Sequence, residues 1–322
     1  MTMPTPPPVR PFTLEELRDA RDRISGVITR TPLIRLEVPG LSRRIWLKLE
    51  SLQPINAFKI RGAANAVAML PEDDRQRGVW TISAGNAGQG VAYAAREAGI
   101  PCTVVVIETA PDTKVERMSR LGARLVKAPF DACWRAMENR EFPGVEGTFV
   151  HPFDDHDFVV GNGTAALEIF EDLPEVDTVV TAFGGGGLIS GVGRGMKLLK
   201  PDVGVWVAEP ETAAPFALSF EKGSPQEFPN WKASFVDGAG GKSVFPRMWE
   251  RVRSVVDGGV IVTLDQTRQA MRTMAETARI IAEGAGALPV AAALEGRVPG
   301  ENIVAVVSGG NIDMKLFAEI VG

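Results

Sequence analysis

"TAFGGGGLISG", residues 181–191, places four glycines in a row between a short apolar run and a helix-like stretch. A tight turn between a strand and a helix needs only one or two glycines, and glycine weakens the interior of either element. A helix N-terminus presents free N–H groups and a partial positive charge, and glycines let the backbone approach an anion closely. A tight turn and a phosphate cradle both explain the segment, and four glycines favour the cradle.

The sequence around this segment alternates between apolar runs and helical patterns. Strands are expected at residues 44–50, 78–83, 102–107, 123–128, 178–183, 204–209 and 302–308. Helices are expected at 57–70, 86–99, 113–122, 131–140, 163–173, 187–199, 264–282 and 313–321, and an earlier one opens with a capping box of Thr13 and Glu16. This alternation predicts an α/β protein with open, twisted parallel sheets covered by helices on both faces.

The number of expected strands exceeds what one compact sheet usually holds. We therefore expect two α/β domains with a cleft between them. The polar loop "VHPFDDHD", residues 150–157, interrupts the alternation and marks a domain boundary.

Composition excludes several function classes. The chain of 322 residues carries a net charge of -5 and no basic block, which argues against a nucleic-acid partner. No apolar run of about 18 residues predicts a membrane span. The proline-rich residues 1–11 lack the pattern of a signal peptide and are expected to form a disordered arm. We expect no metal site, although the two histidines in "HPFDDHD" leave a loop metal formally open, and the two cysteines are expected to be buried thiols of a cytoplasmic protein.

The polyglycine segment does not match the common nucleotide-binding motifs. A dinucleotide fingerprint started at Gly184 or Gly185 ends on Ile189 or Ser190 instead of glycine. The "GKS" at 241–243 lacks the first glycine of a P-loop, because Val236 stands there. The cradle is therefore expected to hold the single phosphate of another cofactor.

Three other stretches place polar or small residues after strands, where ligands bind in open α/β sheets. They are "SLQPINAFKIRGA" (51–63), "SAGNAGQG" (83–90) and "SGGNID" (308–313). Lys59 lies in the first of them at the start of a helix. A lysine alone is more often a solvated side chain, but beside a phosphate cradle Lys59 becomes a candidate Schiff-base lysine for pyridoxal phosphate.

With these motifs in this order, the sequence resembles the pyridoxal-phosphate enzymes of fold type II, in the branch of serine/threonine dehydratases (ammonia-lyases) and serine racemases. The motifs are "FKIRGA", "SAGN-GQG", "HPFDD", "GNGTAALEI", "GGGGLISG", "AEP" and "SGGN". The resemblance implies a tryptophan synthase β-like architecture with the active site in the interdomain cleft. It also implies a large cofactor-binding domain of residues 12–75 and 153–322, a small mobile domain of residues 76–152, and a homodimer.

The resemblance also implies roles for individual residues. Lys59 matches the lysine that bonds the cofactor and moves the Cα proton, and Ser83 matches a catalytic and substrate-binding serine. The cofactor-binding positions are Phe58, Lys59, Asn86, Gly184, Gly185, Gly186, Gly187, Leu188, Gly238, Glu283 and Ser308. The loop of Ser83, Ala84, Gly85, Asn86 and Ala87 matches the clamp on the substrate carboxylate. Ser308 resembles a hydroxyl partner of the pyridine nitrogen, which favours elimination over transamination. These roles imply an ammonia-lyase that converts a β-hydroxy-L-amino acid, such as threonine or serine, into a 2-oxo acid and ammonia.

Several positions depart from the family pattern. Ala84 stands where racemases carry a second serine, which argues against the alternative of a serine racemase. Ala87 replaces a histidine and "INA" (55–57) replaces Thr-Gly-Ser, so a roomier pocket for a bulkier substrate such as a phenylserine is a further alternative. Pro215 replaces an aspartate of the cation site that Glu209 and Ala213 otherwise match. A binding protein without catalysis is a third alternative, and the retained Lys59 counts against it.

Overall fold

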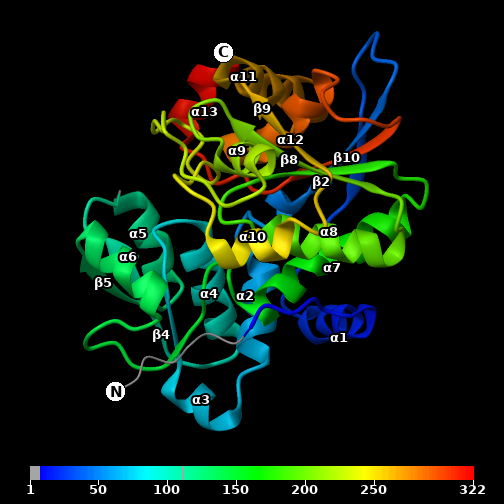
Figure 1. Ribbon diagram of the computed structural model, residues 1–322. Helices are drawn as coiled ribbons and strands as arrows, with labels where there is room; N and C mark the ends of the chain where they lie inside the picture. The colour runs from blue at the N-terminus through cyan, green and yellow to red at the C-terminus, as the bar shows by residue number, and fades with distance from the viewer. Residues whose placement is uncertain (1–7, 111) are drawn as a thin grey trace.

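The computed structural model describes residues 8–110 and 112–322, so residues 1–7 of the expected N-terminal arm lie outside the described residues. Figure 1 shows two bodies, each built around its own sheet. In the described residues, the larger sheet has the strand order β1-β2-β10-β7-β8-β9 and the smaller one the order β5-β4-β3-β6. The prediction of an α/β fold with two sheets is confirmed.

The six-stranded sheet is parallel except at one edge. Its strands are β1 (Leu33–Leu36), β2 (Arg44–Leu49), β7 (Thr178–Ala182), β8 (Gly204–Pro210), β9 (Gly258–Val262) and β10 (Asn302–Val307). β1 pairs antiparallel with β2, with Leu33 opposite Lys48. The expectation of parallel strands throughout is therefore wrong at this edge, where a short loop joins the two strands directly and no crossover helix intervenes.

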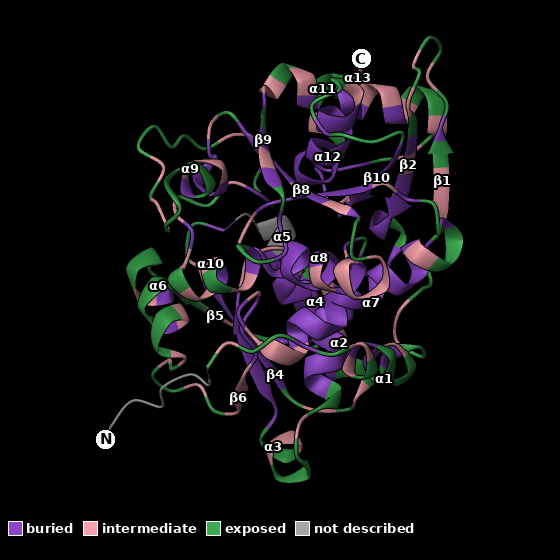
Figure 2. Cartoon of the chain, turned by 45° about the vertical axis from the view of Figure 1, so that its right-hand side comes forward, coloured by how far each residue is buried: buried purple, intermediate pink, exposed green. Residues whose placement is uncertain are grey.

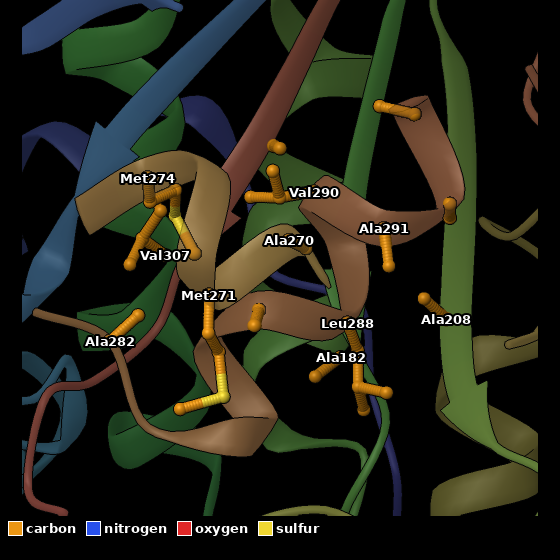
Figure 3. Packing of buried hydrophobic residues seen from close by; sticks show 14 of the residues in the cluster. Ala182, Ala208, Ala270, Met271, Met274, Ala282, Leu288, Val290, Ala291 and Val307 are labelled. Atoms are coloured by element: carbon orange, nitrogen blue, oxygen red, sulfur yellow. The ribbon is translucent and has the colours of Figure 1, made fainter. Parts of the chain in front are cut away.

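Helices cover both faces of the six-stranded sheet. One face carries α11 (Leu264–Thr273), α12 (Gly284–Leu294) and α13 (Met314–Val321), and the other carries α7 (His156–Asp172), α8 (Gly187–Leu199), α9 (Pro215–Lys222) and α10 (Pro246–Val252). Leu288 and Ala291 of α12 lie between Met271 of α11 and the strand residues Ala182 and Ala208 (Figure 3). Because α12 is buried almost along its whole length, it forms the centre of this core.

The four-stranded sheet is parallel and also covered on both faces. Its strands are β3 (Val79–Ile82), β4 (Cys102–Ile107), β5 (Arg124–Ala128) and β6 (Thr148–Phe149). α4 (Asn86–Glu97) and α5 (Asp112–Arg120) pack on one face, and α6 (Phe130–Asn139) packs on the other. Cys102 and Cys133 are buried free thiols, as expected.

The two bodies share a helical seam. α2 (Lys59–Ala68) packs against α4 of the smaller body and against α7 of the larger one, and Figure 2 shows α2 and α4 largely buried. A Cβ at Gly90 of α4 would lie 3.1 Å from the carbonyl oxygen of Lys59, so glycine permits the close approach of the two helices. α1 (Leu14–Ile24), with its predicted capping box, packs on α7, and α3 (Glu72–Arg77) precedes the smaller sheet.

Two expected helices end elsewhere. The helix expected at 264–282 ends at Thr273, and a π-helical turn, Met274–Ala278, follows it before an irregular segment. Arg279 closes that turn in the left-handed conformation, with φ 59°, which an α-helix cannot accommodate. α7 is longer than the expected 163–173 because Asp155 caps its start by accepting from the N–H groups of Asp157 and Phe158.

Candidate active site

A cavity of about 740 Å³ opens where the carboxyl ends of β3, β7 and β10 face each other between the two sheets. In open α/β folds, ligands bind at this end of the strands. The structure brings every sequence-predicted site residue to this cavity: Phe58, Lys59, Ser83, Ala84, Gly85, Asn86, Ala87, Gly184, Gly185, Gly186, Gly187, Leu188, Gly238, Glu283 and Ser308. The roles assigned to them remain predictions.

The polyglycine segment connects β7 to α8 with its backbone against the cavity. Gly186 has φ 85°, a left-handed conformation, and α8 begins at the next residue. A Cβ at Gly185 would lie 2.4 Å from ring atoms of Phe153, and one at Gly184 would lie 2.9 Å from the carbonyl oxygen of Gly238. Side chains are therefore excluded, and the free N–H groups of the α8 N-terminus suit a phosphate.

Lys59, the first residue of α2, presents an amine to the same cavity. Its Nζ donates to the carbonyl oxygen of Pro152 at 2.5 Å and lies 5.1 Å and 5.4 Å from the ring centroids of Phe58 and Phe158. Burial beside these rings lowers the pKa of Lys59 to about 7. A lysine with this pKa is largely uncharged slightly above neutral pH, so its nitrogen can bond a carbonyl carbon or accept a proton.

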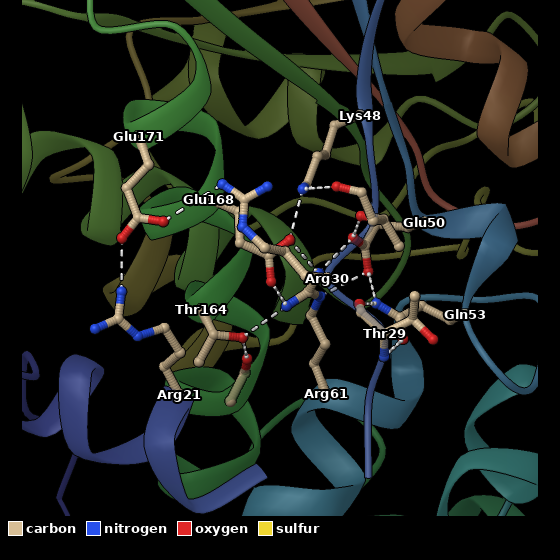
Figure 4. A network of polar contacts seen from close by, with 12 residues as sticks. Arg21, Thr29, Arg30, Lys48, Glu50, Gln53, Arg61, Thr164, Glu168 and Glu171 are labelled. Atoms are coloured by element: carbon tan, nitrogen blue, oxygen red, sulfur yellow. Dashed lines mark hydrogen bonds and ion pairs between the residues drawn. The ribbon is translucent and has the colours of Figure 1, made fainter. Parts of the chain in front are cut away.

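A buried ionic cluster fixes the first turn of α2 behind Lys59. Both nitrogens Nε and Nη2 of Arg61 bond the carboxylate of Glu50, at 2.7 and 2.8 Å. Its Nη1 and Nη2 bond the carboxylate of Glu168 in α7, at 2.7 and 2.8 Å. Lys48 of β2 adds a bond of 2.5 Å to Glu168 (Figure 4).

The charges in this cluster balance, two cations against two carboxylates, and none of the four side chains is more than 4% exposed. Burial would raise the pKa of Glu50, but Arg61 and Lys48 hold that pKa below its usual value. Because two-pronged guanidinium–carboxylate pairs have restricted geometry, the cluster locks α2 against β2 and α7 and so fixes the base of the Lys59 side chain.

A second helix N-terminus faces the cavity from the smaller body. α4 starts at Asn86, directly after the loop that follows β3. The hydroxyl of Ser83 accepts from the N–H of Gly85 at 3.1 Å, so its own O–H remains able to donate. This loop and the first N–H groups of α4 form a site suited to a carboxylate.

The cavity walls also hold residues to which the sequence assigned no role. Phe153 packs on the glycines, and Arg117, Asn311 and Asp237 lie at the cavity surface. Phe153 and Asn311 lie inside motifs that had been singled out, "HPFDD" and "SGGNID". Arg117 gave no signal in the sequence, because which face of α5 meets the cavity depends on how the helix docks.

The motif positions of the cation site and the histidine loop serve local structure. The carboxylate oxygens of Glu209 accept from the backbone N–H groups of Phe216 and Ala217, at 2.9 and 2.8 Å, in the first turn of α9. His151 Nδ1 accepts from the N–H groups of Phe153 and Asp154, at 3.3 and 2.9 Å, and burial lowers its pKa. In the described part of the chain, no helix combines the length and apolar character needed to cross a bilayer.

Comparison with known proteins places this geometry. The family model described as "Pyridoxal-phosphate dependent enzyme" matches residues 24–309. An L-threonine ammonia-lyase from Thermotoga maritima is 39% identical over 318 residues, covering 96% of this chain and 78% of the relative. A catabolic L-threonine dehydratase from Staphylococcus aureus is 35% identical over 318 residues, covering 96% and 92%. The solved structure of maize serine racemase superposes with a TM-score of 0.86 at 30% identity, covering 96% of this chain and 97% of that one.

Proposed function

The chain belongs to the family of pyridoxal-phosphate dependent enzymes, and from that premise we propose that it is an ammonia-lyase for β-hydroxy-L-amino acids such as threonine and serine. The reaction removes the β-hydroxyl as water and releases a 2-oxo acid and ammonia. The observation that carries this proposal is that an amine with a pKa of about 7 and a polyglycine helix N-terminus line the same cavity.

The residues present fit pyridoxal phosphate. The backbone of Gly184–Leu188 would hold the phosphate, because a Cβ in this segment meets other atoms and only main-chain groups face the cavity. Lys59 would hold the aldehyde end, Phe58 would pack beside the ring, and Asn86 and Ser308 would contact its polar edge. When bound, the cofactor supplies an electron sink for negative charge at the substrate Cα.

The chain's own residues perform the proton transfers. Lys59 Nζ, uncharged because it is buried, accepts the proton from the substrate Cα. The Ser83 hydroxyl and the N-terminus of α4 bind the substrate carboxylate and so orient the Cα–H bond toward that amine. The polar groups of this binding site are those of Ser83, Gly85 and Asn86, and the methyl groups of Ala84 and Ala87 add no second proton donor.

Elimination is favoured over racemisation for a reason specific to this chain. Racemisation needs a proton donor on the cofactor face opposite Lys59, and at position 84 this chain has a methyl group. Ser308, a neutral hydroxyl at the cavity wall, cannot hold the ring nitrogen protonated as a carboxylate does. A short-lived charge at Cα favours loss of the β-substituent.

The test is product analysis on the purified protein loaded with pyridoxal phosphate. We expect 2-oxo acid and ammonia from L-threonine and L-serine, a visible absorbance band that disappears in Lys59→Ala, and no 2-oxo acid from that variant. Formation of D-serine without 2-oxo acid would establish the racemase alternative. Cofactor binding without any product would establish the binding protein.

A wider substrate range is a second candidate, favoured by the apolar wall of the cavity. Ile82, Ile107 and Met137 line it on the side of the smaller body, next to Ala84 and Ala87. We propose that this wall accepts a β-substituent larger than methyl, such as the phenyl group of phenylserine. A kcat/KM for threonine that greatly exceeds the value for phenylserine would exclude this extension.

We also propose that residues 76–152 move as a body against residues 12–75 and 153–322, and that the protein works as a cytoplasmic homodimer. The separate sheet between Val79 and Phe149 supports the first statement. The buried free thiols Cys102 and Cys133 are consistent with a reducing compartment. Light scattering on the purified protein measures the oligomeric state, which rests on the family resemblance.

A further inference from the structure

A chain of hydrogen bonds runs across the mouth of the cavity through four side chains that all line it. Arg117 Nη1 donates to Asn311 Oδ1 at 2.6 Å, and Asn311 Nδ2 donates to Asn86 Oδ1 at 2.8 Å. Asn86 Nδ2 donates to Glu283 Oε1 at 2.8 Å. A cation therefore begins the chain and a carboxylate ends it.

The charged ends fix the orientation of both amides. A guanidinium can only donate, so Asn311 must turn its carbonyl toward Arg117 and its NH₂ toward Asn86. A carboxylate at the other end accepts, so Asn86 must turn its NH₂ toward Glu283. Each amide donates and accepts in the same direction along the chain, an arrangement in which hydrogen bonds strengthen one another.

The chain also joins the two bodies of the molecule. Arg117 lies on α5, which packs on β5 and α4 of the smaller body, whereas Asn311 follows β10 of the larger sheet. Asn311 Nδ2 also donates to the carbonyl oxygen of Ile55 at 2.8 Å, which fixes it to the larger body. The bond between Arg117 and Asn311 forms only when the bodies are as close as they are here.

We propose that Arg117 is a positioning residue that couples closure of the cleft to the orientation of Asn86, a side chain that would contact the cofactor. Closing the cleft brings Arg117 to Asn311, and Asn311 then holds the Asn86 carbonyl away from the cofactor and its NH₂ in place. By reciprocity, a cofactor that binds this orientation of Asn86 favours the closed cleft. This inference rests on the proposed function for its kinetic consequences only.

The experiment compares cofactor-free and cofactor-loaded protein carrying Arg117→Met, Arg117→Lys or Asn311→Ala, and the double variant Arg117→Met/Asn311→Ala. One exposed charge-assisted hydrogen bond is worth enough to weaken binding about three- to tenfold. We expect Arg117→Met to raise the dissociation constant of pyridoxal phosphate and the substrate KM by such a factor, with kcat changed less than either. Arg117→Lys keeps a charged donor and should restore part of the loss.

Hydrogen exchange gives a readout that needs no activity. In cofactor-free Arg117→Met, exchange should accelerate in residues 115–121 and also in residues 309–313, although the two segments are far apart in sequence. The matched control is Arg120→Met, on the same helix, because Arg120 pairs only with the exposed Glu116 in its own helix.

The outcomes separate this inference from the proposed function. If Arg117→Met behaves as Arg120→Met in exchange and in cofactor affinity, the coupling is wrong while the lyase proposal stands. Additive losses for Arg117→Met and Asn311→Ala would also overturn it, because residues in one chain must be coupled. If the wild-type protein binds no cofactor, the proposed function fails and the exchange experiment still decides the coupling.

Discussion

The amine of Lys59 makes the stability of the cofactor-free protein depend on pH in a defined direction. Burial lowers the pKa of Lys59 from 10.5 to about 7, so between these two pH values the unfolded chain carries a proton that the folded chain lacks. Raising the pH removes that proton from the unfolded chain and favours the folded state. The stability therefore increases as the pH rises through this range, and the full penalty persists below about pH 7.

The size of this effect follows from the separation of the two pKa values. Each tenfold change in protonation equilibrium is worth about 1.4 kcal/mol, which sets a ceiling of about 5 kcal/mol for the buried amine. The bond to the Pro152 carbonyl stabilises the charged form, and the amine opens onto the cavity. We therefore expect about 2 to 3 kcal/mol, roughly half of the ceiling.

The assay is urea unfolding of cofactor-free protein at a series of pH values, for the wild type and for Lys59→Met, which keeps an unbranched chain without the amine. Lys59→Met should be more stable than the wild type near neutral pH, and the difference should shrink as the pH rises. Other titrating groups cancel in this difference. Lys222→Met, which removes an exposed lysine beside Glu221, should give a difference that does not change with pH. A difference for Lys59→Met that is equally flat would refute the desolvated amine, and with it the proton acceptor of the proposed reaction.

Three further substitutions test other parts of the structure. Gly185→Ala places a Cβ 2.4 Å from the ring of Phe153, so the dissociation constant of pyridoxal phosphate should rise at least about tenfold in a spectrophotometric titration; unchanged binding would remove the phosphate from this segment. Ala84→Ser supplies a hydroxyl on the cavity wall and should increase D-serine formation relative to 2-oxo acid, measured by chiral chromatography; an unchanged product ratio would mean that position 84 does not decide the reaction. Arg61→Leu leaves two buried carboxylates unpaired and should cost about 3 to 5 kcal/mol in urea unfolding; a loss below about 1 kcal/mol, the value of a surface pair, would contradict the ionic cluster.

The parts of the fold that local sequence dictates were predictable. The helix expected at 187–199 is α8, Gly187–Leu199, because glycines mark its start and apolar residues recur at helical spacing. The capping box of Thr13 and Glu16 forms as predicted, since both of its hydrogen bonds lie within four residues. The strands of both sheets are short apolar runs bounded by polar residues, which is typical of buried parallel strands.

The parts that depend on tertiary packing were not predictable. α12 carries Pro289 inside the helix and is buried on all sides, so its sequence has neither helical periodicity nor an uninterrupted helical composition. β1 was missed because only Leu36 of its four residues is buried, and β9 because it contains two glycines. A sheet edge contributes few contacts, and its sequence signal is correspondingly weak.

The candidate site divides in the same way. Lys59, the glycines and Ser83 were found because each lies in a motif at the end of a strand, and parallel strands bring such ends together. The partners of those residues were not found. Asn311 and Arg117 acquire their contact only when α5 docks against the loop after β10, and no spacing in the sequence encodes that approach.

The two walls of the cavity are held by interactions of different strength, which indicates the wall that moves. Behind Lys59, Arg61 and its carboxylate partners are almost completely buried, so breaking any of their bonds leaves an unpaired charge in the core. Across the mouth, Arg117 is exposed, and water can replace Asn311 as its partner at little cost. Opening the cleft therefore requires the loss of weak, hydrated contacts on the α5 side while the α2 side stays intact. The amine and the glycine cradle remain in register through such a motion, and the carboxylate-binding loop of the smaller body is the part that a substrate can draw inward.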